Sequence, residues 1–404
     1  MKTYGIIAEY NPFHNGHRYQ IEEVRRRTGC DAIVAVMSGN FVQRGEAALL
    51  DKWTRAEAAL QCGVDLVLEM PVVYSSSSAE HFAFGGVGIL DGLGIVEGMS
   101  FGVEADRPED LEKAAGLLAE ETPVFQDHLK EALSEGLSYA AARSRALRET
   151  VGEEIEEVIR QPNNILAVEY LKQLYRRGSR MKTLMIPRKT GYYSMNAREQ
   201  TAGAGWIREM VRDGMSLREL TEYYPEELRE LYGSAEMVDP GLMFLLVQYV
   251  LRAGEKLDEI DGVTEGLENR AVRQAAQASS MEQLTEGIKS KRYSRTAVQR
   301  MMTRILLKIK KDDMKAFEEA DRYAVRVLGF SEKGAELIRA AGRAPEPKVR
   351  LITNVNRQKP EDPLLQKMLE YDSLATDLYD LVKNGRMGEH AEYKMKPYRA
   401  EAGR

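Results

Sequence analysis

Apolar and polar residues alternate in blocks over roughly the first two hundred residues of the chain. Short apolar runs with β-branched residues are typical of buried strands, and they occur at "TYGIIAEY", "DAIVAVMSG", "DLVLEMP", "GMSFGVE" and "KTLMIPR". Between them lie segments with helical periodicity, among them "NGHRYQIEEVRRRTG", "DKWTRAEAALQCG", "SSSSAEHFAFGGVGILDGLG" and the stretch from "RPEDLEKAAGLLAEE" to about residue 176. Because strands alternate with helices, the pattern predicts an α/β fold with a Rossmann-like, doubly wound parallel sheet.

The pattern changes near residue 212, where turn residues become sparse and a 3.6-residue periodicity dominates. Helical stretches follow at "DPGLMFLLVQYVLRAG", "GLENRAVRQAAQAS" and "SMEQLTEGIKSKRYSRTAVQRMMTRILLKIKK". We therefore expect two domains, a sheet domain over residues 1–211 and a mostly α-helical domain over residues 212–404. Within the helical half, "RAPEPKVRLIT" breaks the period and is compatible with a short strand.

Composition limits the classes of protein to consider. The chain has 404 residues with 57 basic and 63 acidic side chains, so its net charge of −6 requires any polyanion site to be a local basic patch. Cys30 and Cys62 are too few for a disulfide framework and fit a reducing compartment. With no secretory signal pattern and no apolar run of about 18–20 residues, we expect a cytoplasmic protein without a membrane span.

Two histidines follow the first predicted strand, in "EYNPFHNGHRYQ". Ligands of parallel sheets bind beyond the carboxyl ends of the strands, where this segment lies. If a helix begins here, His14 and His17 project from its first turn, where free N–H groups favour phosphate, and Gly16 leaves room for a close approach. A zinc pair on a helix is usually spaced four apart with a carboxylate, so we predict no metal. The alternative is a pair of solvated or capping histidines in a loop.

A basic segment lies in the helical half. Residues 287–311 hold no Asp or Glu, and their basic residues are Lys289, Lys291, Arg292, Arg295, Arg300, Arg304, Lys308, Lys310 and Lys311. The four-residue spacing of Arg300, Arg304 and Lys308 predicts a stripe on one helix face, suited to RNA phosphates. Tyr293 could stack on a splayed base. The candidate RNA-binding residues are Lys291, Arg292, Arg295, Arg300, Arg304 and Lys308, and Arg322, Arg326, Arg339 and Arg343 extend the surface. A solvated face without a partner is the alternative.

The flanking residues resemble a known family. "HNGH" has the H-x-G-H form of a nucleotidyltransferase superfamily, and "GIIAEYNPFHNGH", "MSGNFVQRGEAALLDKWTRAEAAL", "GVDLVLEMP", "SFGVE", "PNNILAVEYL" and "RVLGF" occur in order. Together they resemble the bacterial tRNA(Met) cytidine acetate ligase family over nearly the whole chain. The resemblance implies a nucleotidyltransferase-type sheet domain and a two-step reaction. Acetate and ATP give acetyl-adenylate, and the wobble cytidine of elongator tRNA(Met) becomes 4-acetylcytidine.

The resemblance also implies roles for particular residues. His14, His17 and Arg44 are the candidate catalytic residues, and Arg44, Lys52 or both are expected to face acetate or the incoming RNA. The candidate nucleotide-binding residues are Ile7, Ala8, Glu9, Tyr10, Asn11, Pro12, Phe13, His14, Asn15, Gly16, His17, Arg18, Tyr19, Gln20, Gly102, Asn163 and Arg188. The family uses one asparagine of this motif as a nucleotide contact, and we choose Asn163 over its neighbour Asn164. The alternative is that either asparagine only caps the helix. ATP, accompanied by Mg²⁺, is expected as a substrate, with no permanently bound cofactor and no obligatory protein partner.

One motif departs from the superfamily pattern. A Ser/Thr-rich run ending in arginine is expected, but "EQTAGAGWIREM" keeps Arg208 and has Gly203, Ala204 and Gly205 in place of hydroxyl residues. Backbone N–H groups of a glycine-rich turn can still hold phosphate. Two other functions remain open. A small-molecule adenylyl- or cytidylyltransferase shares the chemistry but does not need the basic helical half. A non-catalytic RNA-binding protein on a degenerate fold is compatible with the altered motif.

Overall fold

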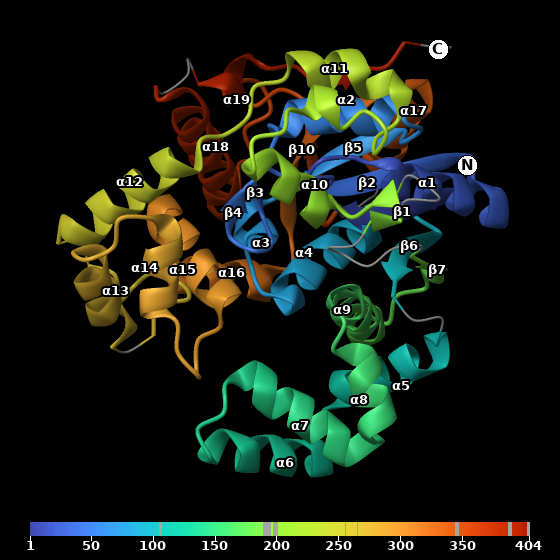
Figure 1. Cartoon of the computed structure of the whole chain (residues 1–404). Helices are drawn as coiled ribbons and strands as arrows, with labels where there is room; N and C mark the ends of the chain where they lie inside the picture. Colours follow the sequence, from blue (N-terminus) through green and yellow to red (C-terminus); the bar gives the residue numbers. More distant parts are fainter. Residues whose placement is uncertain are drawn as a thin grey trace.

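A mixed eight-stranded sheet forms the centre of the molecule (Figure 1). The computed structural model describes residues 1–104, 107–188, 195–196, 201–254, 256–264, 266–343, 347–386 and 390–401. Within them the strands of the sheet are β1 (Thr3–Ala8), β2 (Ala32–Ser38), β5 (Leu66–Met70), β6 (Gly98–Val103), β7 (Lys182–Pro187), β10 (Tyr323–Phe330), β11 (Val349–Ile352) and β12 (Tyr398–Arg399). Two further antiparallel strand pairs are β3 (Phe41–Val42) with β4 (Glu46–Ala47) and β8 (Met195–Asn196) with β9 (Thr201–Ala202).

Helices surround this sheet. They are α1 (Asn15–Thr28), α2 (Lys52–Gln61), α3 (Val72–Ser75), α4 (Ala79–Gly92), α5 (Pro108–Glu120), α6 (Pro123–Ser134), α7 (Tyr139–Val151), α8 (Glu153–Ile159), α9 (Pro162–Arg177), α10 (Ala204–Arg212), α11 (Arg229–Ser234), α12 (Pro240–Arg252), α13 (Leu267–Ala275), α14 (Met281–Ile288), α15 (Arg295–Leu307), α16 (Lys311–Ala320), α17 (Glu332–Ala341), α18 (Pro363–Asn384) and α19 (Ala391–Lys394), with 3-10 turns η1 (Leu217–Glu219) and η2 (Glu226–Leu228). Within the described residues, every helix is too short or too polar to span a lipid bilayer.

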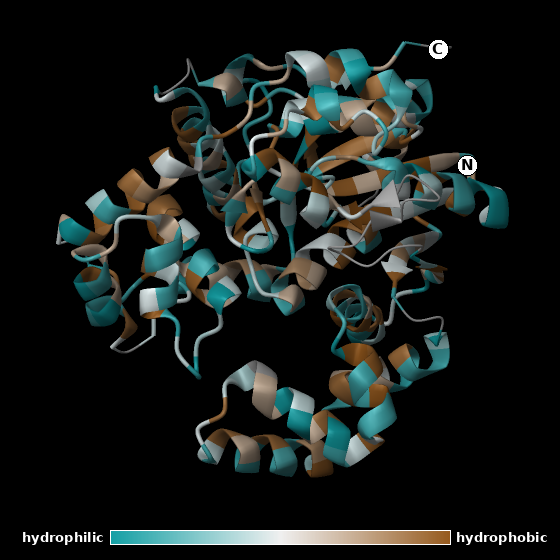
Figure 2. Ribbon diagram, in the orientation of Figure 1, coloured by the Kyte–Doolittle hydropathy of each residue, from teal (hydrophilic) through white to brown (hydrophobic). Residues whose placement is uncertain are grey.

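The five predicted strands form the parallel part of the sheet, in the order β5-β2-β1-β6-β7. Successive residues of each strand face opposite sides, so Val34 and Val36 belong to the apolar cluster that includes α4 and α9, while Ile33 and Ala35 belong to the cluster that includes α1 and α2. Figure 2 shows these apolar strands between helices of mixed hydropathy. The expected doubly wound α/β fold is confirmed, and β1 lies in the middle of it.

The second half of the chain completes the same sheet, which differs from the expected separate helical domain. Strand β10 pairs antiparallel with β5, and β11 and β12 pair parallel with β10. The short strand at "KVRLIT" was predicted and is β11, but β10, "YAVRVLGF", was missed. Arg326 interrupts its apolar run, and that side chain is buried against Glu392. A boundary at residue 211 therefore does not separate two independent cores.

The helices outside the sheet form two groups that flank its carboxyl edge (Figure 1). One group is the lobe of α5 to α8, which is joined to the sheet through α9. The other is the bundle of α12 to α15, which meets the sheet through α15 and α18. Residues at the carboxyl ends of β1 and β6 line one cavity together with residues of both groups.

Candidate active site

A cavity of about 910 Å³ lies beyond the carboxyl ends of β1 and β6. Its walls come from the segment after β1, the start of α4, the lobe helices α7 and α8, the start of α9, and the turn before α15. Residues from 7 to 300 in the sequence thus line one space, with the sheet as its base. This is the place where parallel α/β sheets bind their ligands.

His14 and His17 together cap the start of α1. The Nδ1 atom of His14, the N-cap residue, accepts a hydrogen bond from the N–H of Gly16 at 3.0 Å. The Nδ1 atom of His17 accepts one from the N–H of His14 at 3.3 Å. Because each Nδ1 accepts, each neutral ring carries its proton on Nε2. The sequence offered phosphate binding and capping as alternatives, and both rings cap the helix while also lining the cavity.

The electrostatics keep both rings neutral. Burial lowers the pKa of His14 to about 3, and the charges of Arg188 and Arg208 add to that effect. Burial, His14 and Arg188 hold the pKa of His17 well below its usual value. His14 is 2% exposed, and its Nε2 has no hydrogen-bond partner among the described residues. A buried Nε2–H without a partner is a donor available to a phosphate oxygen.

The reason for Gly16 differs from the expected one. A Cβ atom at this position would lie 2.7 Å from Cε1 of His14. Gly16 therefore makes room for the neighbouring imidazole, and it does not line the cavity itself.

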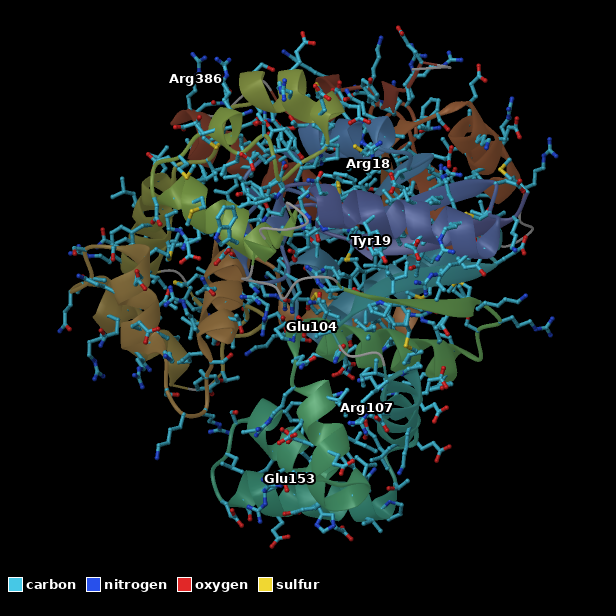
Figure 3. The ribbon with its side chains drawn as sticks, turned by 45° about the vertical axis from the view of Figure 1, so that its right-hand side comes forward. Arg18, Tyr19, Glu104, Arg107, Glu153 and Arg386 are labelled. Carbon is cyan, nitrogen blue, oxygen red and sulfur yellow. The ribbon has the colours of Figure 1, made fainter. Side chains whose placement is uncertain are left out.

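Much of the predicted nucleotide segment faces the cavity, but not all of it. The lining residues from this segment are Ile7, Ala8, Glu9, Tyr10, Asn11, His14, His17 and Gln20. Pro12 and Phe13 are buried in the core, and Asn15 binds the carbonyl of Glu222. Arg18 pairs with Glu227 and Glu22, and Figure 3 shows Arg18 and Tyr19 along α1. Lining residues alternate with residues that hold the segment in place.

The predicted residues at the β6 and β7 end also lie at the cavity. Gly102, Asn163 and Arg188 all line it. A Cβ at Gly102 would lie 3.3 Å from Cγ of Arg188, so the glycine leaves space for that arginine. Asn163 donates to Glu104 at 2.7 Å (Glu104 is labelled in Figure 3). The neighbouring Asn164 is fully buried and bonds to backbone groups instead. Asn164 therefore has a structural role, which supports the choice of Asn163. The contact of Asn163 with nucleotide stays a prediction.

The altered second motif forms the start of a helix at the cavity. Gly203 is the N-cap of α10, and Ala204, the first helical residue, lines the cavity. Arg208 donates from Nη1 to the carbonyl of Asn11 at 2.7 Å and so ties α10 to the histidine segment. The N–H groups of this helix start can take the place of the absent hydroxyls.

Part of the basic segment reaches the cavity. Arg292 and Arg300 line it together with Arg44, which comes from the loop after β3. Burial, with the charge of Arg44, lowers the pKa of Arg300 to about 10. The predicted long helix is two helices, α14 and α15, and the exposed Lys291 and Arg292 lie in the turn between them. Arg295 begins α15, is exposed, and pairs with Glu282 and Glu286.

The predicted stripe of Arg300, Arg304 and Lys308 is wrong. Arg304 is buried, where it donates to Ser77 at 2.6 Å and pairs with Asp261. Lys308 lies past the end of α15 in a left-handed conformation, so it does not continue the helix face. Other parts of the predicted surface are also engaged elsewhere. The Tyr293 hydroxyl bonds to Thr264, Arg322 pairs with Asp362, and Arg326 is buried.

Lys52 does not face acetate or RNA. Its side chain is 0% exposed and its Nζ lies 2.7 Å from Glu69 and 2.5 Å from Glu392. Burial alone would lower the pKa of Lys52, but the two carboxylates outweigh it and raise the pKa above its usual value. Lys52 is a structural link between the sheet and the C-terminal segment. Arg44 and Lys52 were both predicted to face acetate or RNA, and of the two only Arg44 lines this cavity.

Sequence reasoning missed several charged residues that line the cavity, among them Glu80, Arg143 and Glu169. They come from α4, α7 and α9, and their positions in the sequence form no recognisable motif. A carboxylate within the apolar run "NNILAVEYL" was the one local indication, because a charge there must find a buried partner.

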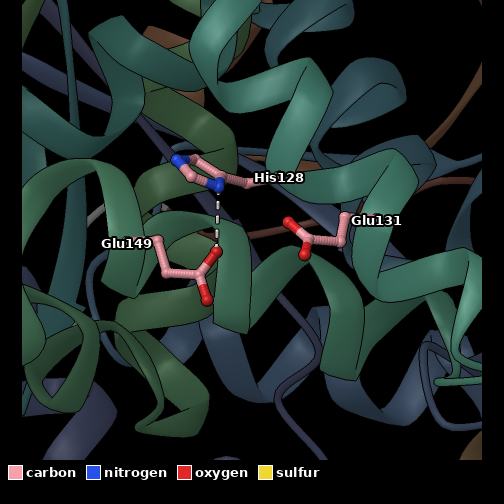
Figure 4. A group of neighbouring side chains, drawn as sticks. All are labelled: His128, Glu131 and Glu149. Atoms are coloured by element: carbon pink, nitrogen blue, oxygen red, sulfur yellow. Dashed lines mark ion pairs between the residues drawn. The ribbon is translucent and has the colours of Figure 1, made fainter.

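Figure 4 shows the one group of possible metal ligands found among the described residues. It consists of His128, Glu131 and Glu149 on α6 and α7, and Nδ1 of His128 lies 3.0 Å from Glu149. Both glutamates are exposed, and none of the three residues lines the cavity. The group is therefore separate from the candidate active site.

This fold and this histidine pair define a nucleotidyltransferase of the H-x-G-H class. A sequence model described as "HIGH Nucleotidyl Transferase" matches residues 1–394. The tRNA(Met) cytidine acetate ligase of Thermoanaerobacter sp. (strain X514) is 41% identical over 389 residues, which cover 94% of this chain and 95% of that one. The corresponding ligase of Clostridium perfringens (strain SM101 / Type A) is 36% identical and covers 98% of this chain and 99% of its own. The chain belongs to the tRNA(Met) cytidine acetate ligase family.

Solved structures agree with this assignment. The crystal structure of Thermotoga maritima TmcAL bound with alpha-thio ATP has a TM-score of 0.88 and 31% identity, covering 99% of each chain. The apo form of that protein has a TM-score of 0.90 and 32% identity, covering 99% of this chain and 100% of that one. The similarity thus extends over both halves of the chain.

Proposed function

We propose that this chain joins acetate to tRNA at the expense of ATP. Acetate and ATP give acetyl-adenylate and pyrophosphate, and the acetyl group then passes to the exocyclic amine of the wobble cytidine of elongator tRNA(Met). The products are 4-acetylcytidine and AMP, and the reaction belongs to the cytoplasm. The observation that carries the proposal is the buried, unpartnered Nε2 of His14 at a cavity beyond β1, together with the family membership of the chain.

In the first step, a carboxylate oxygen of acetate attacks the α-phosphate and pyrophosphate leaves. No covalent bond to the protein is needed, so catalysis rests on alignment and on donors where charge gathers. In this proposal the Nε2–H groups of His14 and His17 donate to α-phosphate oxygens. Arg188 and the start of α10 are placed to hold the leaving pyrophosphate, with ATP entering as its magnesium complex.

In the second step, the cytidine amine attacks the acetyl carbon. The new bond is C–N, the bond that breaks joins the acetyl carbon to AMP, and the amine loses one proton. We propose that Arg44, Arg292 and Arg300 meet RNA at the mouth of the cavity, flanked by Lys291 and Arg295. The RNA-binding set therefore omits Arg304 and Lys308. The chain needs no protein partner for either step.

The test measures both half-reactions. Purified protein should catalyse exchange of labelled pyrophosphate into ATP only when acetate is present. Nucleoside mass spectrometry should find 4-acetylcytidine in tRNA(Met) incubated with protein, ATP and acetate. Exchange that depends on a phosphorylated small molecule would favour a small-molecule nucleotidyltransferase, and tRNA binding without ATP turnover would favour a non-catalytic protein.

A further inference from the structure

A buried carboxylate at the cavity keeps hydrogen-bonding capacity that the protein does not use. Glu169 of α9 is 0% exposed and lines the cavity. Its Oε1 lies 2.5 Å from Nη2 of Arg143, and its Oε2 lies 2.6 Å from Nζ of Lys172. Each oxygen thus has one cationic neighbour at the distance of a charge-assisted hydrogen bond. Because a carboxylate oxygen has two lone pairs, each oxygen of Glu169 can still accept one further hydrogen bond.

Its neighbours complete a small polar pocket. Arg143 is one helical turn after Tyr139 on α7, and both residues line the cavity. Tyr139 is 56% exposed, so its ring is accessible. Glu80, at the start of α4, accepts from Lys172 at 2.7 Å and fixes that lysine between the two carboxylates. The lobe helix α7 and the sheet-side helices α4 and α9 therefore supply a carboxylate, a guanidinium and an aromatic ring to one part of the cavity.

We propose that Glu169, Arg143 and Tyr139 form the subsite for the base that is acetylated. A cytosine edge presents an amine donor at N4 and acceptors at N3 and O2. Glu169 accepts from one N4 hydrogen, the N–H groups of Arg143 not used by Glu169 donate to N3 and O2, and Tyr139 stacks on the ring. This inference rests on the proposed function, because it names the residues that select the acceptor. Uracil has the reverse pattern at positions 3 and 4, and it would place its O4 against the carboxylate.

The adenine of ATP is the alternative occupant of this pocket, because its N6 amine and N1 acceptor match the N4 amine and N3 acceptor of cytosine. Two observations favour cytosine. The O2 acceptor, which adenine lacks, suits the two-pronged guanidinium of Arg143. The residues proposed for ATP phosphate come from the sheet side, since Arg188 follows β7 and α10 is tied by Arg208 to Asn11 after β1, whereas Tyr139 and Arg143 come from α7 of the lobe.

The test compares tRNA(Met) transcripts that carry C or U at the acceptor position. The wild type should bind the C form roughly 10-fold to 100-fold more tightly, the range expected for one good base contact. Glu169→Gln and Arg143→Lys should each remove most of this preference, while the KM for ATP in acetate-dependent pyrophosphate exchange stays within about threefold. Tyr139→Ala, at an exposed site that does not threaten folding, should weaken both transcripts equally, because stacking does not read the base edge.

Arg145→Lys is the matched control, because Arg145 lies on the same helix but pairs with Glu135 and Glu149 outside the cavity. It should keep the full preference for C. A raised KM for ATP with an unchanged C preference would assign the pocket to adenine and overturn the inference. If Glu169→Gln and Arg143→Lys lower the melting temperature and reduce tRNA binding and pyrophosphate exchange in parallel, and Tyr139→Ala changes neither assay, then Glu169 and Arg143 have a structural role and the inference fails. If the wild type binds C over U but forms no 4-acetylcytidine, the proposed function fails and the subsite stands.

Discussion

The Nδ1 atom of His17 accepts a hydrogen bond from the backbone N–H of His14 at 3.3 Å, and the two imidazole rings lie 3.8 Å apart. This contact places the proton of His17 on Nε2, and the bond from the Gly16 N–H to Nδ1 of His14 does the same for His14. The pair thus does the work of a capping box while keeping two neutral donors at the cavity. Its donors need no protonation to bind phosphate.

The first prediction separates capping from catalysis. Asn is a good N-cap and Gln a good third residue of a capping box, so His14→Asn and His17→Gln should keep α1 intact. Each replaces the rigid imidazole Nε2–H by a flexible amide N–H at another position, and acetate-dependent pyrophosphate exchange should fall by roughly 100-fold or more in each. Affinity for tRNA should stay near that of the wild type. Arg26→Gln, at an exposed arginine of the same helix, is the control and should retain full exchange. Near-normal exchange in both histidine variants would remove the pair from the active site.

The second prediction concerns pH and stability. Since the pKa of His14 is lowered from 6.5 to about 3 on folding, the unfolded chain binds a proton there that the folded chain does not. The free energy of unfolding should therefore rise with pH between those values and be lost as the pH falls through them. One such group contributes a slope of at most about 1.4 kcal/mol per pH unit. Urea unfolding at pH values between about 5 and 6.5 should show a shallower slope for His14→Asn than for the wild type. Identical slopes would mean that His14 is protonated in the folded protein.

The third prediction concerns Lys52. Lys52→Met leaves Glu69 and Glu392 buried without their shared cation, which should cost about 3–5 kcal/mol of unfolding free energy. Adding Glu69→Gln should recover part of that loss because it removes the uncompensated charge, whereas Glu392 keeps its ion pair with Arg326. Denaturant unfolding measures both effects. Since Lys52 does not line the cavity, the folded variant should keep its KM for ATP. A large rise in that KM would mean that Lys52 takes part in nucleotide binding.

The local parts of the site could be predicted from sequence, and the long-range parts could not. His14 and His17 belong to a strand, turn and helix that are contiguous, so spacing alone placed them at the carboxyl end of β1. The burial of Lys52 and Arg304 depends on Glu392 and Asp261, which are distant in sequence and give no periodic signal. The same limit hid Arg143 and Glu169.

The fourth prediction compares an alanine substitution at Gly102, which lies beside Arg188, with one at Gly116, which has open space around it. Gly102→Ala places a Cβ 3.3 Å from Cγ of Arg188 and should displace that arginine. The KM for ATP in pyrophosphate exchange should rise several-fold, with a melting temperature close to that of the wild type. Gly116→Ala on α5 is the control, because a Cβ there meets nothing within 4 Å, and helix propensity should make it slightly more stable. Unchanged exchange kinetics in Gly102→Ala would show that Arg188 does not bind the nucleotide where we propose.

The fifth prediction contrasts two arginines one helical turn apart on α15. Arg300 lines the cavity, whereas Arg304 is buried against Ser77 and Asp261. Arg300→Gln should weaken tRNA binding and lower the slope of log affinity against log salt by roughly 0.7–0.9, the value for one lost phosphate contact. Arg304→Gln should instead lower the unfolding free energy by roughly 2–4 kcal/mol without changing the salt slope of the folded protein.

The exposed Arg273 of α13 provides the control, since Arg273→Gln removes a charge away from the cavity and should leave both quantities nearly unchanged. Pyrophosphate exchange distinguishes the remaining outcomes. If Arg300 contacts RNA alone, Arg300→Gln leaves acetate-dependent exchange within about threefold of the wild type, because that half-reaction involves no RNA. If exchange falls together with tRNA affinity, Arg300 and its neighbour Arg44 act on acetate or on the adenylate. If the salt slope changes in Arg304→Gln and not in Arg300→Gln, the RNA reaches α15 from its buried side, and the orientation proposed for the complex is wrong.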